Sequence, residues 1–194
     1  MGQGFPRMKG VLRTDATPPV VVTGPSELEL SAGGSEVAGE LERHWAAAYR
    51  LALGMRLDHH EAQDAAQEAA LLAWRRRAGW DRGRPFGPWF LAIVANRCRE
   101  RYRSRWWRVA RVPVVPEAAT GDAPHDALGD VALRSALRSL APRLRLALVL
   151  RYYLDMPVSE VARVSGCSID AAESRIRRAL ARLRPLITPL EDAP

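Results

Sequence analysis

The chain of 194 residues carries 29 basic and 22 acidic side chains, which gives a formal net charge of +7. This length allows one mid-sized domain or two small ones. Arg, Glu or Gly interrupts the longest apolar stretches well before the roughly 18 residues that a membrane span requires, so we expect no membrane insertion. The N-terminal residues lack the charged, apolar and small-residue regions of a secretory signal, which predicts a cytoplasmic protein.

Five segments follow from composition and periodicity. Residues 1–36 are rich in Pro, Gly, Ser and Thr and predict a disordered tail, whereas helical periodicity fills residues 37–109. The pattern lapses over 110–126, which predicts a linker, and returns over 127–187 before a short tail at 188–194. No segment alternates with period two. We therefore expect an all-α protein in which two small helical domains are joined by a flexible linker.

The first helical unit contains an acidic and polar stripe. A helix is expected to begin near Asp58, with alanines and Leu72 on its inner face. Its other face carries Asp64, Gln67, Glu68 and Leu71. In an otherwise basic protein this stripe could dock a basic protein surface, although a solvated helix face is the ordinary alternative.

The third helical segment, expected to start near Pro88, becomes steadily more basic. Its arginines alternate with aromatic residues: Arg97, Arg99, Arg101, Arg103, Arg105 and Arg108 are interleaved with Tyr102, Trp106 and Trp107. Such a ridge can follow phosphates, and aromatic rings beside it can stack on exposed bases. A solvated basic face above core tryptophans is the alternative.

All basic residues except Lys9 are arginines, whose planar guanidinium binds two phosphate oxygens at once. A GC-rich genome would also favour arginine over lysine. The clustering of the charge is therefore a better indicator of function than its amount.

The last two predicted helices form a helix-turn-helix. A short helix at about 158–164 is joined to a longer one, which we expect to end at Pro185 and Pro189. Gly166 can supply the positive φ of the turn, and Ser168 can cap the second helix. The predicted core between the two helices comprises Val161, Ala162, Ile169, Ala172 and Ile176. The exposed face would present Ser168, Asp170, Ala171, Ser174, Arg175, Arg177 and Arg178 to a DNA major groove, unless the pair is an ordinary helical hairpin.

Enzymatic motifs are not recognisable in the sequence. His59 and His60 lack the spacing of a zinc-protease helix, and Cys98 and Cys167 are too isolated for a disulfide framework or a cysteine zinc site. We expect both cysteines to be small buried hydrophobic residues. No phosphate-binding loop, nucleophile elbow or carboxylate pair is present, so we expect no catalytic residue, no metal and no cofactor.

Both helical units, in this order, resemble the extracytoplasmic-function sigma factors of the sigma-70 family. In the first unit the resemblance is carried by DAAQEAALLAW and FGPWFLAIVANRCRERYR, and in the second by the stretch from ALRSLAPRLRL to RRALARLR. It covers about residues 37–187. It implies a protein that is not an enzyme by itself, that binds core RNA polymerase and promoter DNA, and that opens the DNA strands.

The resemblance also implies roles for individual residues. Asp64, Gln67, Glu68 and Leu71 would bind the coiled-coil clamp of the polymerase's largest subunit. The minus-ten element would be bound as single strand by Trp80, Asp81, Arg82, Phe86 and Asn96, with Arg97, Arg99, Arg101 and Arg103 on its backbone. The minus-thirty-five duplex would face Ser168, Ala171, Ser174, Arg175, Arg177 and Arg178. Ala171 and Glu173 depart from the Thr and Lys that the family often has there.

Other functions are compatible with the same pattern. A helix-turn-helix regulator that binds duplex operators without joining polymerase would need neither the melting helix nor the acidic stripe. A member that binds polymerase or another partner without initiating transcription is a third hypothesis, motivated by Ala171 and Glu173. The resemblance further implies that an anti-sigma factor is a possible partner.

Overall fold

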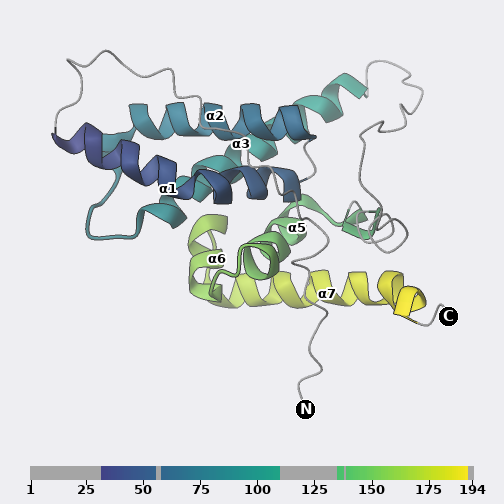
Figure 1. Cartoon of the computed structure of the whole chain (residues 1–194). Coiled ribbons are helices and arrows are strands. Elements are labelled where there is room, and N and C mark those ends of the chain that lie inside the picture. The colour runs from purple at the N-terminus through teal and green to yellow at the C-terminus, as the bar shows by residue number, and fades with distance from the viewer. Residues whose placement is uncertain (1–31, 56–57, 110–134, 138, 192–194) are drawn as a thin grey trace.

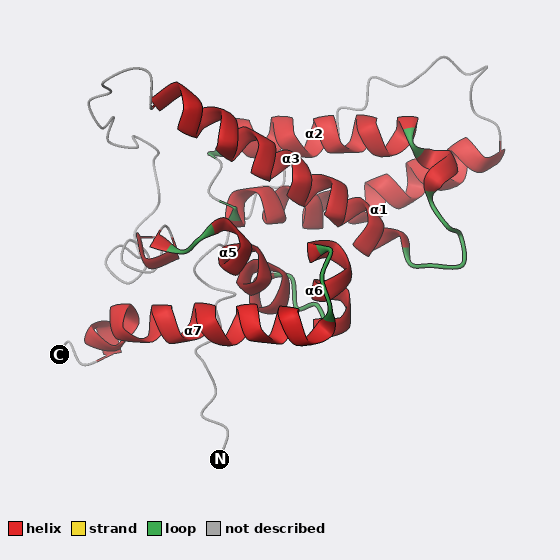
Figure 2. Cartoon of the chain, turned by 180° about the vertical axis from the view of Figure 1, so that it is seen from behind, coloured by secondary structure: helices red, strands yellow, loops and turns green. Residues whose placement is uncertain are grey.

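The computed structural model describes residues 32–55, 58–109, 135–137 and 139–191 (Figure 1). These residues form helices joined by short loops, with no strand among them (Figure 2), which confirms the expected all-α class. The first unit consists of α1 (Ala32–Gly54), α2 (His59–Arg75), η3 (Arg77–Gly79) and α3 (Phe86–Val109). The second consists of α5 (Pro142–Leu148), the π-helical η4 (Val149–Tyr153), α6 (Val158–Ser165) and α7 (Ile169–Glu191).

The first unit is a bundle in which α1, α2 and α3 all contact one another. Helix α2 begins with a capping box, because the Asp58 side chain accepts from the Glu61 backbone amide at 2.7 Å and the Glu61 carboxylate accepts from the Asp58 amide. Its buried face is made of alanine only: Ala62, Ala65, Ala66, Ala69, Ala70 and Ala73. Small side chains let α2 lie close to its neighbours, so the position of its outer face is tightly fixed.

The second unit is built around a buried arginine. Arg145 of α5 has no exposed surface and donates to the backbone carbonyls of Leu137 and Leu140, both at 2.8 Å. Helix α7 runs beneath α5 and α6 in Figure 1 and contacts both of them. Its core face repeats at helical spacing through Ala172, Ile176, Ala179 and Leu183.

The two units pack against each other. Helix α3 contacts α6, and the C-terminal end of α1 contacts η4. Arg145 also donates to the Met55 carbonyl at 3.4 Å. The units approach each other closely at Gly54, where a Cβ atom would lie 2.7 Å from Cγ1 of Val149. Buried residues of both units thus belong to one hydrophobic core.

Several boundaries differ from the sequence-based expectations. Helix α1 begins at Ala32, within the segment that we expected to be a tail, and α3 begins at Phe86. Helix α7 continues past Pro185 and Pro189, because a proline removes its own hydrogen bond without ending a helix whose neighbouring bonds persist. The tail residues 1–31, the predicted linker at 110–126 and residues 192–194 lie outside the described part of the chain.

Two predicted core residues are more exposed than expected. Ile169 was expected between α6 and α7, but it is the first residue of α7 and 52% of its surface is exposed. Cys167 in the turn is only partly buried, whereas Cys98 on α3 is fully enclosed. Within the described residues, no helix is long and apolar enough to cross a bilayer.

Candidate nucleic-acid interface

The acidic stripe of α2 lies on the helix face opposite the alanines. The side chains of Asp64 and Glu68 are 61% and 50% exposed, and Gln67 is partly buried. Leu71, one turn further, is 48% exposed and is one of two large hydrophobic residues with this much exposure in the described part of the chain. The stripe therefore combines two carboxylates with an apolar contact, a combination suited to a basic protein surface.

Arg101 of α3 binds this stripe directly. Its Nη2 donates to Oε1 of Glu68 at 2.6 Å, and its Nη1 lies 3.7 Å from Oδ2 of Asp64. The sequence places Arg101 in the DNA-binding ridge and the two carboxylates in the docking stripe. The structure joins the two groups, although 33 residues separate Arg101 from Glu68. Helical periodicity could not predict this contact, because it reports only neighbours on the same helix.

The loop before α3 separates buried aromatic residues from exposed charges. Trp80 and Phe86 are 8% and 4% exposed, and their rings meet edge to face with centroids 5.0 Å apart. The Trp80 indole donates to the Arg84 carbonyl at 3.1 Å. Both rings were expected to bind DNA; in the structure they are largely buried and pack against each other beneath this loop.

The same loop exposes Asp81 and Arg82. Asp81 accepts from the Gly83 amide at 2.9 Å and pairs with Arg84 at 3.1 Å. The Arg82 guanidinium lies 5.8 Å from the centroid of the Trp80 ring and pairs with Glu36 of α1 at 3.0 Å. The exposed surface of this loop is therefore charged and held in place by ion pairs.

On α3 the predicted DNA-binding residues are exposed or partly exposed. Asn96 and Arg103 are exposed, Arg97 pairs with Glu100 at 2.8 Å, and Arg99 donates to Oδ1 of Asn96 at 2.7 Å. Burial lowers the pKa of Arg99, and the positive charges of Arg143 and Arg175 lower it further. The side chains of Tyr102, Arg105, Trp106, Trp107 and Arg108 lie outside the described residues.

Helices α6 and α7 form the predicted helix-turn-helix. Gly166 has φ +61°, as the turn requires, and the Cys167 amide donates to the Ala162 carbonyl at 3.0 Å. The Ser168 hydroxyl caps α7 by accepting from the Ala171 amide at 3.2 Å. These contacts confirm the expected turn and cap.

The outer face of α7 carries the residues expected to bind duplex DNA. Ser168 and Arg178 are exposed, while Ala171, Ser174 and Arg175 are partly exposed. Arg178 donates to the Ser174 carbonyl at 3.2 Å. Arg177 is set apart from them, because it lines a different surface.

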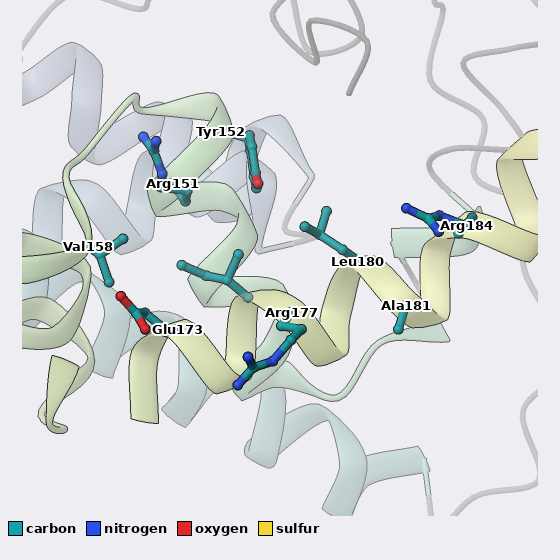
Figure 3. A pocket seen from close by; sticks show the side chains of 9 residues that line it. Arg151, Tyr152, Val158, Glu173, Arg177, Leu180, Ala181 and Arg184 are labelled. Carbon is teal, nitrogen blue, oxygen red and sulfur yellow. The ribbon is translucent and has the colours of Figure 1, made fainter. Parts of the chain in front are cut away.

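That surface is a groove of about 690 Å³ between η4, α6 and α7 (Figure 3). Apolar side chains of Tyr152, Val158, Ile176 and Leu180 line it, and Arg151, Glu173, Arg177 and Arg184 add charge. The sequence analysis did not identify this groove, because its residues come from three separate elements. Glu173 therefore lines this groove, whereas Arg175 and Arg178 lie on the other face of α7.

Comparisons with known proteins agree with this architecture. Residues 41–108 match the family model of sigma-70 region 2, and residues 130–183 match that of sigma-70 region 4. The chain is 30% identical over 132 residues to the RNA polymerase sigma-E factor of Streptomyces avermitilis, covering 66% of this chain and 71% of that protein. It is 30% identical over 175 residues to the RNA polymerase sigma factor CnrH of Cupriavidus metallidurans, covering 82% and 91%.

Solved structures show the same fold. The structure of CnrH in complex with the cytosolic domain of CnrY aligns with a TM-score of 0.59 and 28% identity, covering 84% of this chain and 90% of that one. The sigma factor RpoE in complex with the anti-sigma factor NepR from Bartonella quintana aligns with a TM-score of 0.67 and 24% identity, covering 79% and 97%. The chain therefore belongs to the sigma-70 family, as an alternative sigma factor of the extracytoplasmic-function type.

Proposed function

We propose that this sigma factor binds core RNA polymerase through α2, the minus-ten element through α3 and the preceding loop, and the minus-thirty-five element through α7. The observation that carries the proposal is the pairing of an exposed acidic stripe on α2 with a basic helix-turn-helix on the same chain. A duplex-binding regulator would need only the second feature. The chain would act in the cytoplasm and would supply no catalytic group, because the polymerase performs the nucleotide chemistry.

On α2, the carboxylates of Asp64 and Glu68 would attract a basic coiled coil, and Leu71 would add apolar contact. Gln67, which is partly buried between them, would donate or accept a hydrogen bond. Such an arrangement would favour one orientation of the partner, because the charged contacts align the two surfaces while Leu71 buries apolar area.

Single-strand binding would use the exposed groups of the first unit, namely Asp81, Arg82, Asn96, Arg97, Arg99, Arg101 and Arg103. Trp80 and Phe86 would act by holding the loop in shape. Binding energy spent on unpaired bases shifts the equilibrium from closed to open promoter DNA, since only the open form offers those contacts. A flipped base costs a few kcal/mol in lost stacking, which contacts in the binding site must offset.

Duplex binding would use the N-terminal end of α7, the end that contacts base edges in helix-turn-helix proteins: the capping residue Ser168, and Ala171, Ser174, Arg175 and Arg178 of the helix itself. Arg177 would contribute less, because it lines the groove. The logarithm of the affinity should fall linearly with the logarithm of the salt concentration, with a slope of about −0.9 for each neutralised duplex phosphate.

Regulation by an anti-sigma factor is part of the proposal. Two similar proteins, CnrH and RpoE of Bartonella quintana, have been solved in complexes with CnrY and with the anti-sigma factor NepR. A partner of this kind would compete with polymerase or DNA for the surfaces described above.

The test is transcription by sigma-free RNA polymerase from the source organism on genomic DNA fragments. We expect discrete transcripts when the chain is added, and their loss in a D64N/E68Q variant. E42Q, on an exposed residue of α1 outside the stripe, is the matched control and should retain full activity. No discrete transcripts with the native chain, while duplex binding is retained, would support the regulator instead.

A further inference from the structure

Ile169 is exposed at a place where the sequence predicted a core residue. Its surface is 52% accessible, and among the residues that the structure describes only Leu71 is a large hydrophobic side chain of comparable exposure. The other apolar residues predicted for the core between α6 and α7 are each 8% exposed or less: Val161, Ala162, Ala172 and Ile176. Burial within the chain therefore does not explain an isoleucine at position 169.

Local helix chemistry does not explain it either. A β-branched side chain loses rotamer freedom in a helix and has no group that could cap the free amides. Both neighbours do serve the helix end. The Ser168 hydroxyl accepts from the Ala171 amide at 3.2 Å, and Asp170 places a carboxylate in the first turn, where it interacts favourably with the helix dipole.

The position of Ile169 indicates the base edges of duplex DNA as its ligand. It is the first residue of the second helix of the helix-turn-helix, directly after the turn at Gly166 and the cap at Ser168. The N-terminal residues of this helix contact base edges when such proteins bind the major groove. Side chains lean toward the N-terminus of their helix, so an isoleucine at the first position extends toward the tip of α7.

Only one chemical group on the base edges of the major groove matches an aliphatic side chain. The donors and acceptors of guanine, adenine and cytosine would lose water without gaining a hydrogen bond, whereas the C5-methyl group of thymine is itself apolar. Contact between this methyl group and Ile169 would bury apolar surface on both. Arg175 and Arg178, further along α7, provide the positive charge that favours DNA over an apolar protein surface as the partner.

We propose that Ile169 is a specificity-determining residue of this sigma factor, which recognises the methyl group of a thymine in the minus-thirty-five element. The inference deepens the proposed duplex binding by α7 and rests on it. It requires the element to contain at least one position at which thymine binds more tightly than uracil, although both bases form the same hydrogen bonds.

Uracil measures the contribution of this contact, because it differs from thymine only in lacking the methyl group. Burial of one methyl group corresponds to a change in affinity of about fourfold. We therefore expect uracil to weaken binding by about this factor at the contacted thymine. Thymines elsewhere in the duplex should show no such effect.

The experiment starts from duplexes that the full native chain selects from a pool of random sequences, and needs no polymerase. Each thymine of the selected site is replaced in turn by deoxyuridine, and fluorescence anisotropy gives the Kd for the native chain, I169A and I169V. The replacement that weakens native binding about fourfold should change the affinity of I169A by less than about twofold. I169V, which keeps a branched aliphatic side chain, should retain most of the difference.

Two controls separate recognition from a loss of structure or of general affinity. Because Ile169 is exposed, I169A should show the same thermal unfolding midpoint as the native chain by circular dichroism. I169A should also bind an unrelated duplex as tightly as the native chain does, since contacts to phosphate do not depend on this residue.

The possible failures are distinguishable. Equal effects of uracil on the native chain and I169A, or no thymine at which uracil weakens native binding, would overturn the proposal while leaving duplex binding by α7 intact. Native duplex binding by I169A, combined with loss of transcription when polymerase is added, would assign Ile169 to a protein contact and would also overturn it. No sequence-selective duplex binding by the native chain would contradict the proposed function of α7 itself, and this inference with it.

Discussion

The two units hold their arginines in different ways. In the first, Arg97, Arg99 and Arg101 each contact an acidic or amide side chain of the same unit. In the second, Arg175 and Arg178 form no ion pair with any residue that the structure describes. We infer from this difference that the proposed duplex-binding surface of α7 is free of internal ion pairs, whereas the proposed single-strand surface of α3 must first release internal partners.

The comparison assumes that the second unit is stably folded, and the buried hydrogen bonds of Arg145 are expected to stabilise it. R145M removes the charged donors to the carbonyls of Leu137, Leu140 and Met55 while keeping a long side chain. Because buried carbonyl acceptors would lose their donor, we expect the free energy of unfolding to fall by about 1–3 kcal/mol. Denaturant titration followed by circular dichroism measures it. R143M, on an exposed neighbour, should change stability by less than about 0.5 kcal/mol, and equal effects of both would refute this role of Arg145.

Replacing the arginines of α7 one at a time tests whether this surface binds duplex DNA. R175A and R178A are each expected to weaken binding to a minus-thirty-five duplex by about 1–3 kcal/mol where the arginine contacts a base edge. Where the arginine contacts a phosphate, the slope of log affinity against log salt concentration should become shallower by about 0.9. R177A should have a smaller effect, because Arg177 lines the groove. A larger loss with R177A would place the duplex on the groove side of α7.

The packing of the two units is tested at Gly54. G54A places a Cβ atom 2.7 Å from Val149, so we expect a loss of about 1–3 kcal/mol in stability although alanine favours helix. In a V149A background the same change should be nearly neutral, because the two γ-carbons it would meet are gone. Thermal unfolding of the four proteins completes the cycle. An equal cost in both backgrounds would show that the units do not meet at this point in solution.

The smallest effect concerns the two thiols. Burial raises the pKa of the Cys98 thiol to about 12, whereas Cys167 is partly exposed in the turn before α7. At pH 8 we expect a disulfide reagent to modify Cys167 in the native chain and Cys98 only after unfolding. Rapid modification of Cys98 in C167S would show that the core of the first unit opens readily.

Burial of this thiol also predicts a pH dependence. Its folded pKa lies above the ordinary value, so the unfolded chain releases the proton first as pH rises. The contribution of the neutral thiol to stability is therefore complete below about pH 9 and is lost as the pH rises toward 12. Replacing Cys98 by Ala should remove this part of the alkaline destabilisation.

Local signals in the sequence predicted much of the fold. The alanine spacing identified the buried face of α2, and Gly166 and Ser168 identified the turn and cap of the helix-turn-helix. These features depend on residues within a few positions of one another. They follow from helical geometry and capping chemistry, which the sequence shows directly.

Features that depend on distant partners were not predictable in this way. The bond of Arg101 to Glu68 joins two helices, and the burial of Trp80 and Phe86 depends on how a charged loop folds over them. The groove beside α7 likewise requires three elements to be brought together. Periodicity states which face of a helix is apolar, but the neighbouring element decides what a polar or aromatic residue contacts.

The most direct test of the account is strand opening at a promoter identified by the transcription experiment. Permanganate oxidation of unpaired thymines would be measured with the chain alone, with core polymerase alone and with both. The account predicts reactive thymines at the minus-ten element only with both, while the chain alone binds the minus-thirty-five duplex. Reactive thymines with the chain alone, or none with both, would contradict it.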